Sequence, residues 1–269
     1  MPDPPPSPAF TTIAEVIAEM TRRWQALRQA GDWRAVFAES YLRTTEQILA
    51  TAAQAGAFEN PEWLIQLDCA FAQRYFTAID YWDAGQDCPL PWYIAFQGNR
   101  EKRTLVIQDL LLGMNAHINY DLPYALDATI PPDAPPEALA SYQRDHSRMN
   151  TLLARTVDVV QQATDYYDPL LLLADESLGP GDEFGTAQLI TVWRARSWDH
   201  FLLLRGSADR AAADRLIEGS AHEYGLLLMQ VQRAAPQLYW PNRLYRDAVS
   251  LWRRRPRPTP GPPGPGAGA

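Results

Sequence analysis

Helix start signals recur along this chain, and they constrain its fold more than any other feature. Thr12-Ile13-Ala14-Glu15 is a capping box, in which the Thr hydroxyl and the Glu carboxylate satisfy free amides of the first turn. Asn60-Pro61-Glu62 combines a cap, a first-position proline and an acid that the helix dipole favours. No run of alternating β-branched residues competes with these signals, so the chain is expected to be all-α.

Hydrophobic residues recur at helical spacing between the start signals, and they predict a helical bundle of seven to eight helices around one core. After a first helix beginning at Thr12, the expected helices cover about residues 32–55, 60–82, 99–120, 135–164, 183–204 and 207–233, with a short one after Pro241. Pro123 disfavours helical geometry at the residue before it, which predicts that the fourth helix ends there.

Both ends of the chain are rich in proline. Residues 1–9 and residues 253–269 have compositions that cannot pack, so they are expected to be disordered around a single all-α domain at residues 10–252. The sequence has no recognisable secretory signal, and no apolar run approaches the ~20 residues that a membrane span needs. With two cysteines and no Cys-x-x-Cys pair, free thiols and a cytoplasmic location are expected.

The net charge is −8, and Lys102 is the only lysine. Binding to nucleic acid is dominated by neutralisation of phosphates, so an acidic chain is not expected to have nucleic acid as its main partner. A small-molecule ligand or substrate remains the expected partner, and the oligomeric state is left open.

The segment Gly113–Pro123 (GMNAHINYDLP) holds the densest concentration of chemistry. His117 and Asp121 are four residues apart and project from one side of a helix. Such a pair can share a proton, bind a common metal or form a hydrogen bond. The sequence leaves these three alternatives open.

Three further polar residues lie on apolar helix stripes: Asp68, His146 and His200. Burying such a group alone costs several kcal/mol, so each must be hydrogen-bonded or coordinated. If the helices converge, His117, Asp121, His146 and His200 are candidate ligands for zinc or iron, with Asp68 and Asn119 as candidate catalytic groups. This hypothesis describes a metal-dependent hydrolase.

The alternative is a non-catalytic helical module that binds an apolar small molecule or a protein partner. In that interpretation the same His and Asp side chains form a structural hydrogen-bond network. Aromatic residues around the third expected helix, which include Trp63, Tyr75, Trp82 and Trp92, then either line an apolar pocket or form plain core.

Two resemblances bear on this segment. The spacing of His117 and Asp121 resembles one ligand pair of the helical zinc phospholipase and single-strand nuclease superfamily, although Asp127 stands where that pattern has a histidine. Over most of its length the chain resembles an uncharacterised bacterial family of all-helical proteins. The residues that carry the second resemblance are GMNAHINYDLP, Asn60-Pro61-Glu62-Trp63, Phe71 with Tyr75-Phe76 and Ala78, and Trp193-Arg194. It implies a helical fold and a role for His117, Asn119 and Asp121, and it names no reaction.

Overall fold

The computed structural model describes residues 10–52, 56–101, 104–165, 181–234 and 243–248, and these residues form helices and no strand. The all-α prediction is confirmed, and in these ranges the helix count is close to the expected seven to eight. The ends expected to be disordered, residues 1–9 and 253–269, lie outside the described residues. The single domain at residues 10–252 stays a prediction.

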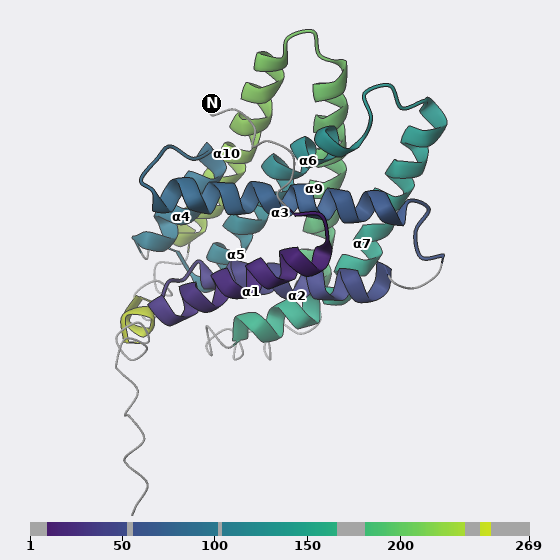
Figure 1. Cartoon of the computed structure of the whole chain (residues 1–269). Coiled ribbons are helices and arrows are strands. Elements are labelled where there is room, and N and C mark those ends of the chain that lie inside the picture. The colour runs from purple at the N-terminus through teal and green to yellow at the C-terminus, as the bar shows by residue number, and fades with distance from the viewer. Residues whose placement is uncertain (1–9, 53–55, 102–103, 166–180, 235–242, 249–269) are drawn as a thin grey trace, which may run out of the picture.

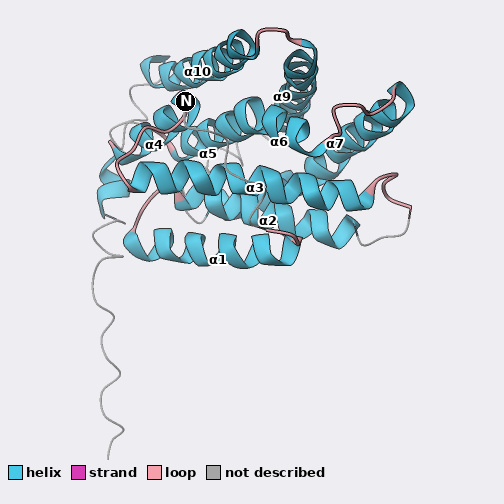
Figure 2. Ribbon diagram, turned by 45° about the horizontal axis from the view of Figure 1, so that its top comes forward, coloured by secondary structure: helices cyan, strands magenta, loops and turns pink. Residues whose placement is uncertain are grey.

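The first three helices are α1 (Ile13–Ala30), α2 (Ala35–Ala52) and α3 (Pro61–Asp83). Figures 1 and 2 show them lying side by side across one face of the molecule. The predicted capping box opens α1: the Glu15 N–H donates to Thr12 Oγ1 at 3.2 Å, and the Thr12 N–H donates to a Glu15 carboxylate oxygen at 3.1 Å. Gly31, with φ of 67°, ends this helix in the left-handed conformation that glycine adopts without strain.

The start predicted for the helix at residues 99–120 is wrong. Helix α4 (Leu90–Arg100) precedes it, so Trp92 and Tyr93 lie on a helix and not on a loop. Helix α5 (Val106–Asn115) begins only after Leu105, whose backbone is extended with ψ of 159°. The Leu105 N–H donates to the Gln108 side chain at 2.8 Å, and this local cap starts a new helix that the apolar pattern did not reveal.

The end predicted for that helix is also wrong, because the chain stays helical past Pro123. A π-helical segment, η1 (Ala116–Asp121), leads directly into α6 (Leu122–Thr129). Pro123 stands in the first turn of α6, where a missing N–H is tolerated. The wider π turn therefore joins two helices where the sequence predicted a break.

The remaining longer helices are α7 (Pro136–Asp165), α9 (Gly181–Gly206) and α10 (Arg210–Ala234), and residues 243–248 form the short helix expected after Pro241. The α9 and α10 helices form a hairpin that rises from the body in Figure 1. The larger core cluster joins residues of every described helix from α1 to α10 except α7, and a smaller one lies among α3, α6, α7 and α9. The π-helical segment η1 contacts α3, α4, α9 and α10, which places it at the centre of the fold.

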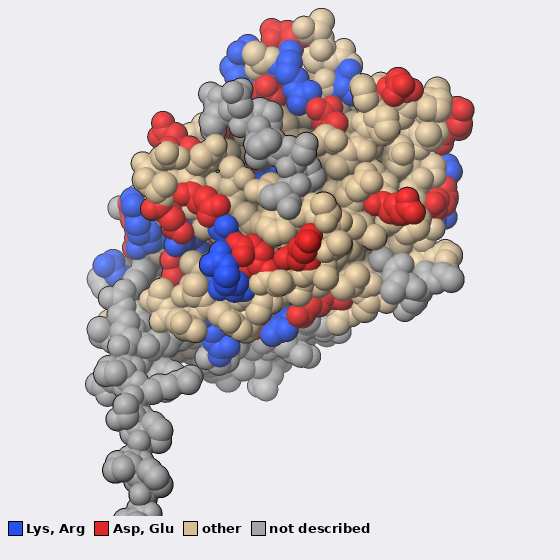
Figure 3. Space-filling model, viewed as in Figure 1, with Lys and Arg blue, Asp and Glu red and all other residues tan. Residues whose placement is uncertain are grey.

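The surface mixes charges of both signs. Arg23 bridges Glu19 and Asp80 at 2.6 Å each, and Arg34 contacts Asp83 at 2.7 Å. Figure 3 shows basic side chains adjoining acidic ones on this face, so its described part carries no continuous basic patch. None of the described helices is long and apolar enough to cross a membrane.

Candidate acid–base site at the π-helical segment

Side chains of α9 donate hydrogen bonds to backbone carbonyls of η1 and so support its π-helical turn. The Leu122 N–H donates to the His117 carbonyl, five residues back, and Pro123 has no N–H to continue the pattern. The Ser197 hydroxyl of α9 donates to the Ile118 carbonyl, with the Trp193 carbonyl of its own helix as a second acceptor at 2.9 Å. Side chains from α9 thus replace backbone donors that the proline and the π register remove.

His200, one turn after Ser197 on α9, also donates a hydrogen bond to the backbone of η1. Burial lowers the pKa of His200, and its hydrogen bond to the Asn119 backbone acts in the opposite direction. The side chain is 7% exposed, so its ring is a buried donor to η1. This contact gives His200 a structural partner without a metal ion.

His117 and Asp121 meet inside the core. His117 Nδ1 lies 3.0 Å from Asp121 Oδ2, and the same oxygen accepts a hydrogen bond from Trp92 Nε1 at 2.9 Å. The other carboxylate oxygen of Asp121 lies 3.5 Å from Arg74 Nε. Both oxygens of Asp121 therefore face N–H groups, and the contact with Nδ1 orients the imidazole.

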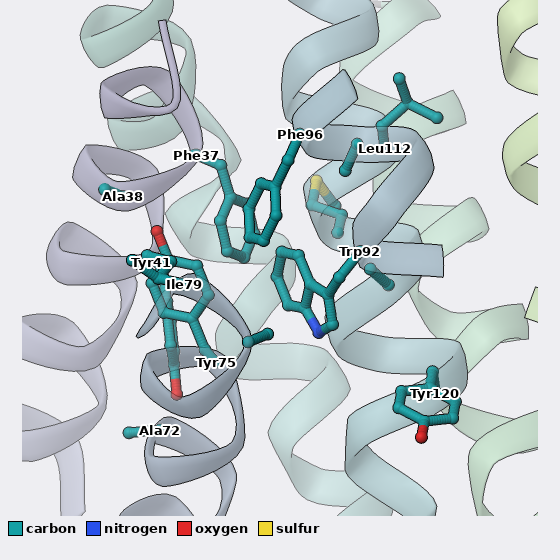
Figure 4. Packing of buried hydrophobic residues seen from close by; sticks show 14 of the residues in the cluster. Phe37, Ala38, Tyr41, Ala72, Tyr75, Ile79, Trp92, Phe96, Leu112 and Tyr120 are labelled. Carbon is teal, nitrogen blue, oxygen red and sulfur yellow. The ribbon is translucent and has the colours of Figure 1, made fainter. Parts of the chain in front are cut away.

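Aromatic rings surround the imidazole. Phe71 stacks on His117 with ring centroids 3.4 Å apart and planes within 6°. The Tyr41 ring is 4.4 Å away, and Phe37, Tyr75 and Trp92 lie at 5.8–6.0 Å. Figure 4 shows the rings of Phe37, Tyr41, Tyr75 and Trp92 gathered between α2, α3 and α4.

The second nitrogen of this imidazole has no protein partner. His117 Nε2 is buried and makes no hydrogen bond with the described residues. Burial lowers the pKa of His117, against the hydrogen bond and the charge of Asp121, which raise it. At neutral pH the imidazole is therefore uncharged, with its proton on Nδ1 toward Asp121 and its lone pair on Nε2.

Two more buried polar groups without protein partners lie in this part of the core, and one of them, Tyr41, packs against the His117 ring. Asp68 Oδ2 and the Tyr41 hydroxyl make no hydrogen bond with described residues. Burial raises the pKa of Asp68 to about 7. It also raises the pKa of Tyr41, and the charges of Asp68 and then Asp121 add to that rise, so the Tyr41 hydroxyl lies within electrostatic range of both carboxyls. Asp68 precedes Phe71 by one turn of α3, on the side that faces His117.

The chain matches the model of a sequence family. The model of a family of unknown function, DUF5995, matches residues 13–231. The chain is a DUF5995 protein. This confirms the predicted membership of an uncharacterised helical family. Comparison with curated proteins and with solved structures finds no match. The DUF5995 match includes His117, Asp121 and Asp68 and ends before residues 243–248.

The other candidate residues of this DUF5995 chain lie apart from the imidazole. His146 on α7 belongs beside the smaller core cluster, with its ring 5.2 Å from Trp198. Its carbonyl accepts a hydrogen bond from Arg194 at 2.9 Å, and burial, then the Arg194 charge, hold the pKa of His146 well below its usual value. Asn119 donates to Asn115 Oδ1 at 3.0 Å, and Asn115 donates to the Ala221 carbonyl on α10 at 2.8 Å.

The structure therefore unites two of the four candidate ligands, His117 and Asp121. Among the described residues, no group of three or more His, Cys, Asp or Glu side chains is arranged to hold a metal ion. The zinc or iron site suggested by His117, Asp121, His146 and His200 is not formed by this part of the DUF5995 chain. Asp121 contacts His117 and Trp92, the His146 ring lies against Trp198, and the His200 ring bonds the Asn119 backbone, so these side chains face different neighbours.

Sequence reasoning missed the residues that orient and enclose the imidazole. Trp92 lies on α4, a helix that the sequence pattern did not predict, and nothing in its neighbourhood marks it as the donor to Asp121. Arg74 lies between apolar positions of α3, and its charge in a helix stripe is a signal that could have found it. Tyr41 follows Phe37 by one turn, but this spacing predicts only a core position.

Proposed function

We propose that His117 and Asp121 form the acid–base centre of a hydrolase that acts on a small molecule. One observation carries the proposal: Asp121 holds Nδ1 of a buried, neutral imidazole, while Nε2 has no partner among described residues. This is the division of roles found where histidine is a general base, with one nitrogen oriented by a carboxylate and the other free to take a proton.

In this proposal His117 Nε2 takes a proton from a water molecule that attacks the substrate. Asp121 is the positioning residue, and Arg74 and Trp92 hold its carboxylate in place. Asp68, with its pKa raised to about 7 by burial, keeps a proton near neutral pH and can give it to the leaving group. Tyr41 links the two groups, since its ring lies 4.4 Å from His117 and the charge of Asp68 raises the pKa of its hydroxyl.

A metal-dependent hydrolase remains a narrower form of the proposal. A carboxylate that holds Nδ1 of a histidine while Nε2 stays free is the usual environment of a histidine ligand. His117 would be the protein ligand, and zinc or iron would polarise the attacking water. Since no cluster of three ligands exists among the described residues, water or substrate would have to complete the coordination.

The second candidate function is a non-catalytic module that binds an apolar small molecule. The aromatic enclosure of His117 favours it, because the rings packed at 3.4–6.0 Å from the imidazole would contact a planar apolar ligand once the surrounding helices opened. Cys69 and Cys88 are free thiols, which are typical of a reducing compartment, so we propose the cytoplasm as the location for either function.

Hydrolysis of p-nitrophenyl acetate and p-nitrophenyl phosphate tests the proposal. We expect turnover of one of these probes by the wild type and a loss of about 100-fold or more in His117→Ala. His146→Ala is the matched control, since it removes a buried histidine far from the site. Equal turnover by wild type and His117→Ala, or none above buffer in either, rejects the hydrolase.

Metal content separates the two forms of the proposal. Stoichiometric zinc or iron in wild-type protein purified without chelator, lost in His117→Ala and kept in His146→Ala, supports the metal-dependent form. Activity in metal-free protein supports the form that uses only side chains.

The pH profile tests the two proton roles. Below the lowered pKa of His117 the base is protonated and turnover falls, and above about pH 7 Asp68 loses its proton and turnover falls again. We expect Asp68→Asn to lower the rate and to remove the alkaline decline. An alkaline decline that survives in Asp68→Asn contradicts the role of Asp68 as proton donor.

A further inference from the structure

A buried arginine joins helices α7 and α9, which contact one another beside the smaller core cluster (Figures 1 and 2). Arg194 of α9 is 6% exposed. Its Nε donates to Asn150 Oδ1 at 2.8 Å, and one Nη donates to the His146 carbonyl at 2.9 Å. Both acceptors lie on α7, so the guanidinium is buried where the two helices meet.

The guanidinium of Arg194 has no counter-ion among the described residues. Its two hydrogen bonds go to uncharged oxygens, and they use only some of the N–H donors that a guanidinium carries. Burial lowers the pKa of Arg194 to about 10, and no nearby carboxylate opposes that fall. An arginine with this pKa is charged at neutral pH, so α7 and α9 enclose a positive charge that their described side chains do not neutralise.

Arg246 shows how the same protein neutralises another buried arginine. Arg246 is 0% exposed, and its Nη2 lies 2.8 Å from Asp109 Oδ2. A buried charge without such a partner is costly, and buried arginines are rare unless they are paired. A bound anion would give Arg194 the partner that Asp109 gives Arg246.

A second buried group without a partner lies beside Arg194. His146 is 2% exposed, and its Nε2 makes no hydrogen bond with the described residues. Burial and then the Arg194 charge lower the pKa of His146 well below its usual value, so the imidazole is uncharged at neutral pH. A neutral imidazole can carry its proton on Nε2 and donate it. Guanidinium and imidazole therefore both have N–H groups available to a ligand.

Charge and surroundings indicate the class of that ligand. With His146 neutral, the pair carries a single positive charge, which a carboxylate balances and a phosphate dianion exceeds. The planar fork of a guanidinium also matches the two oxygens of a carboxylate. The Trp198 ring lies 5.2 Å from the His146 ring, and Met149 belongs to the same apolar core cluster. An apolar group attached to the carboxylate would therefore contact apolar side chains.

We propose that Arg194 and His146 bind the carboxylate of an apolar carboxylic acid between α7 and α9. Arg194 forms the ion pair through the N–H groups that its bonds to α7 leave available, and His146 Nε2 donates to the same carboxylate. Because both side chains are buried, entry of the acid requires α7 and α9 to separate locally. The site is separate from His117 and does not depend on the proposed hydrolase.

Isothermal titration calorimetry of the full chain with benzoate, at constant ionic strength, tests this site. We expect one saturable site in the wild type and an affinity at least about tenfold lower in Arg194→Gln, which removes the charge. Arg196→Gln is the matched control, because Arg196 lies on the same helix and donates to the Tyr224 hydroxyl instead. It should keep the wild-type affinity. No saturable binding by the wild type, or equal affinities of wild type and Arg194→Gln, overturns the proposal.

Three further measurements fix the place and the class of the site. His146→Phe keeps a ring beside Trp198 but removes Nε2, so it should weaken benzoate binding, and an unchanged affinity contradicts the shared site. His117→Ala should bind benzoate as the wild type does, and a loss there would place benzoate in the aromatic enclosure of His117 instead. Inorganic phosphate should bind more weakly than benzoate, and equal affinities overturn the assignment to carboxylates.

If Arg194→Gln does not fold, Arg194→Lys decides by the same comparison. Lysine keeps the charge but loses the planar fork, so the affinity for benzoate should fall below that of the wild type and of Arg196→Gln. Wild-type affinity in Arg194→Lys overturns the proposal. Binding of benzoate that depends on Arg194, in a protein that hydrolyses neither p-nitrophenyl probe, would support this site and reject the hydrolase.

Discussion

At the scale of single residues, the site depends on how each polar atom is satisfied. Asp121 has donors on both oxygens, His117 uses one nitrogen, and Asp68 and Tyr41 keep buried oxygens without partners among the described residues. A buried polar atom without a partner is costly and is retained where it serves a ligand or a reaction. This contrast within one cluster separates the orienting groups from the groups available for chemistry.

Gly113→Ala tests the close contact between α2 and α5. The added methyl would lie 2.5 Å from Cγ of Phe37, so we expect a loss of about 1–3 kcal/mol in the free energy of unfolding. Gly219→Ala on α10 is the control, because no atom lies within 4 Å of its added Cβ, and there we expect a gain of about 0.5–1 kcal/mol. Urea unfolding measures both changes, and equal effects of the two substitutions would contradict the close contact.

At the scale of elements, η1 is a helix whose lost backbone hydrogen bonds are replaced by α9. Ser197 binds the Ile118 carbonyl and His200 binds the Asn119 backbone. The π turn also fixes the direction of His117 and Asp121, which lie inside it. The six residues that α9 supports through hydrogen bonds therefore also carry the candidate site.

A double-mutant cycle on Pro123 and Ser197 tests this compensation. Ser197→Ala alone leaves the Ile118 carbonyl without its side-chain donor and should cost about 1–3 kcal/mol in the free energy of unfolding. In a Pro123→Ala background the new N–H can bond a carbonyl of the preceding turn, so the same substitution should cost less. Chemical denaturation of the four proteins gives the coupling, and strictly additive costs would show that the proline and the serine act independently.

At the scale of the whole molecule, buried titratable groups set how stability depends on pH. Burial raises the pKa of Asp68 from its usual 3.8 to about 7 and that of Asp109 to about 6. Between pH 4 and these values the folded protein binds protons that the unfolded chain has released. Since stability falls with pH wherever the folded state binds more protons, both groups make stability decline across this range.

Asp68→Asn tests the larger of these contributions. Asparagine resembles the protonated acid and does not ionise, so we expect the variant to match the wild type near pH 4 and to exceed it at pH 8 by on the order of a few kcal/mol. Urea unfolding at pH 5, 6, 7 and 8 measures the two curves. Parallel curves over this range would mean that Asp68 is ionised in the folded protein at low pH.

Particular residues show how far the sequence leads. The capping box at Thr12 and the Asn60-Pro61-Glu62 start both mark real helices. The cap expected from Asn60 is wrong, because its side chain makes no cap bond and donates to Ser141 and Asp145 of α7. The spacing of His117 and Asp121 predicted only that both project from one side of a helix, and the structure places His117 Nδ1 3.0 Å from Asp121 Oδ2. The prediction that the helix breaks at Pro123 was wrong, because Ser197 and His200 supply the hydrogen bonds that the proline removes. Both residues come from a helix far along the chain.

By itself the sequence determined the helical class, most helix starts and the His117–Asp121 pair, since each rests on interactions among near neighbours. Only the tertiary structure decided the rest. It placed the His146 ring against Trp198 and the His200 ring at the Asn119 backbone, brought Trp92 to Asp121 and paired Arg246 with Asp109. These contacts join residues from different helices, and helix packing sets them through shape and burial that no local pattern records.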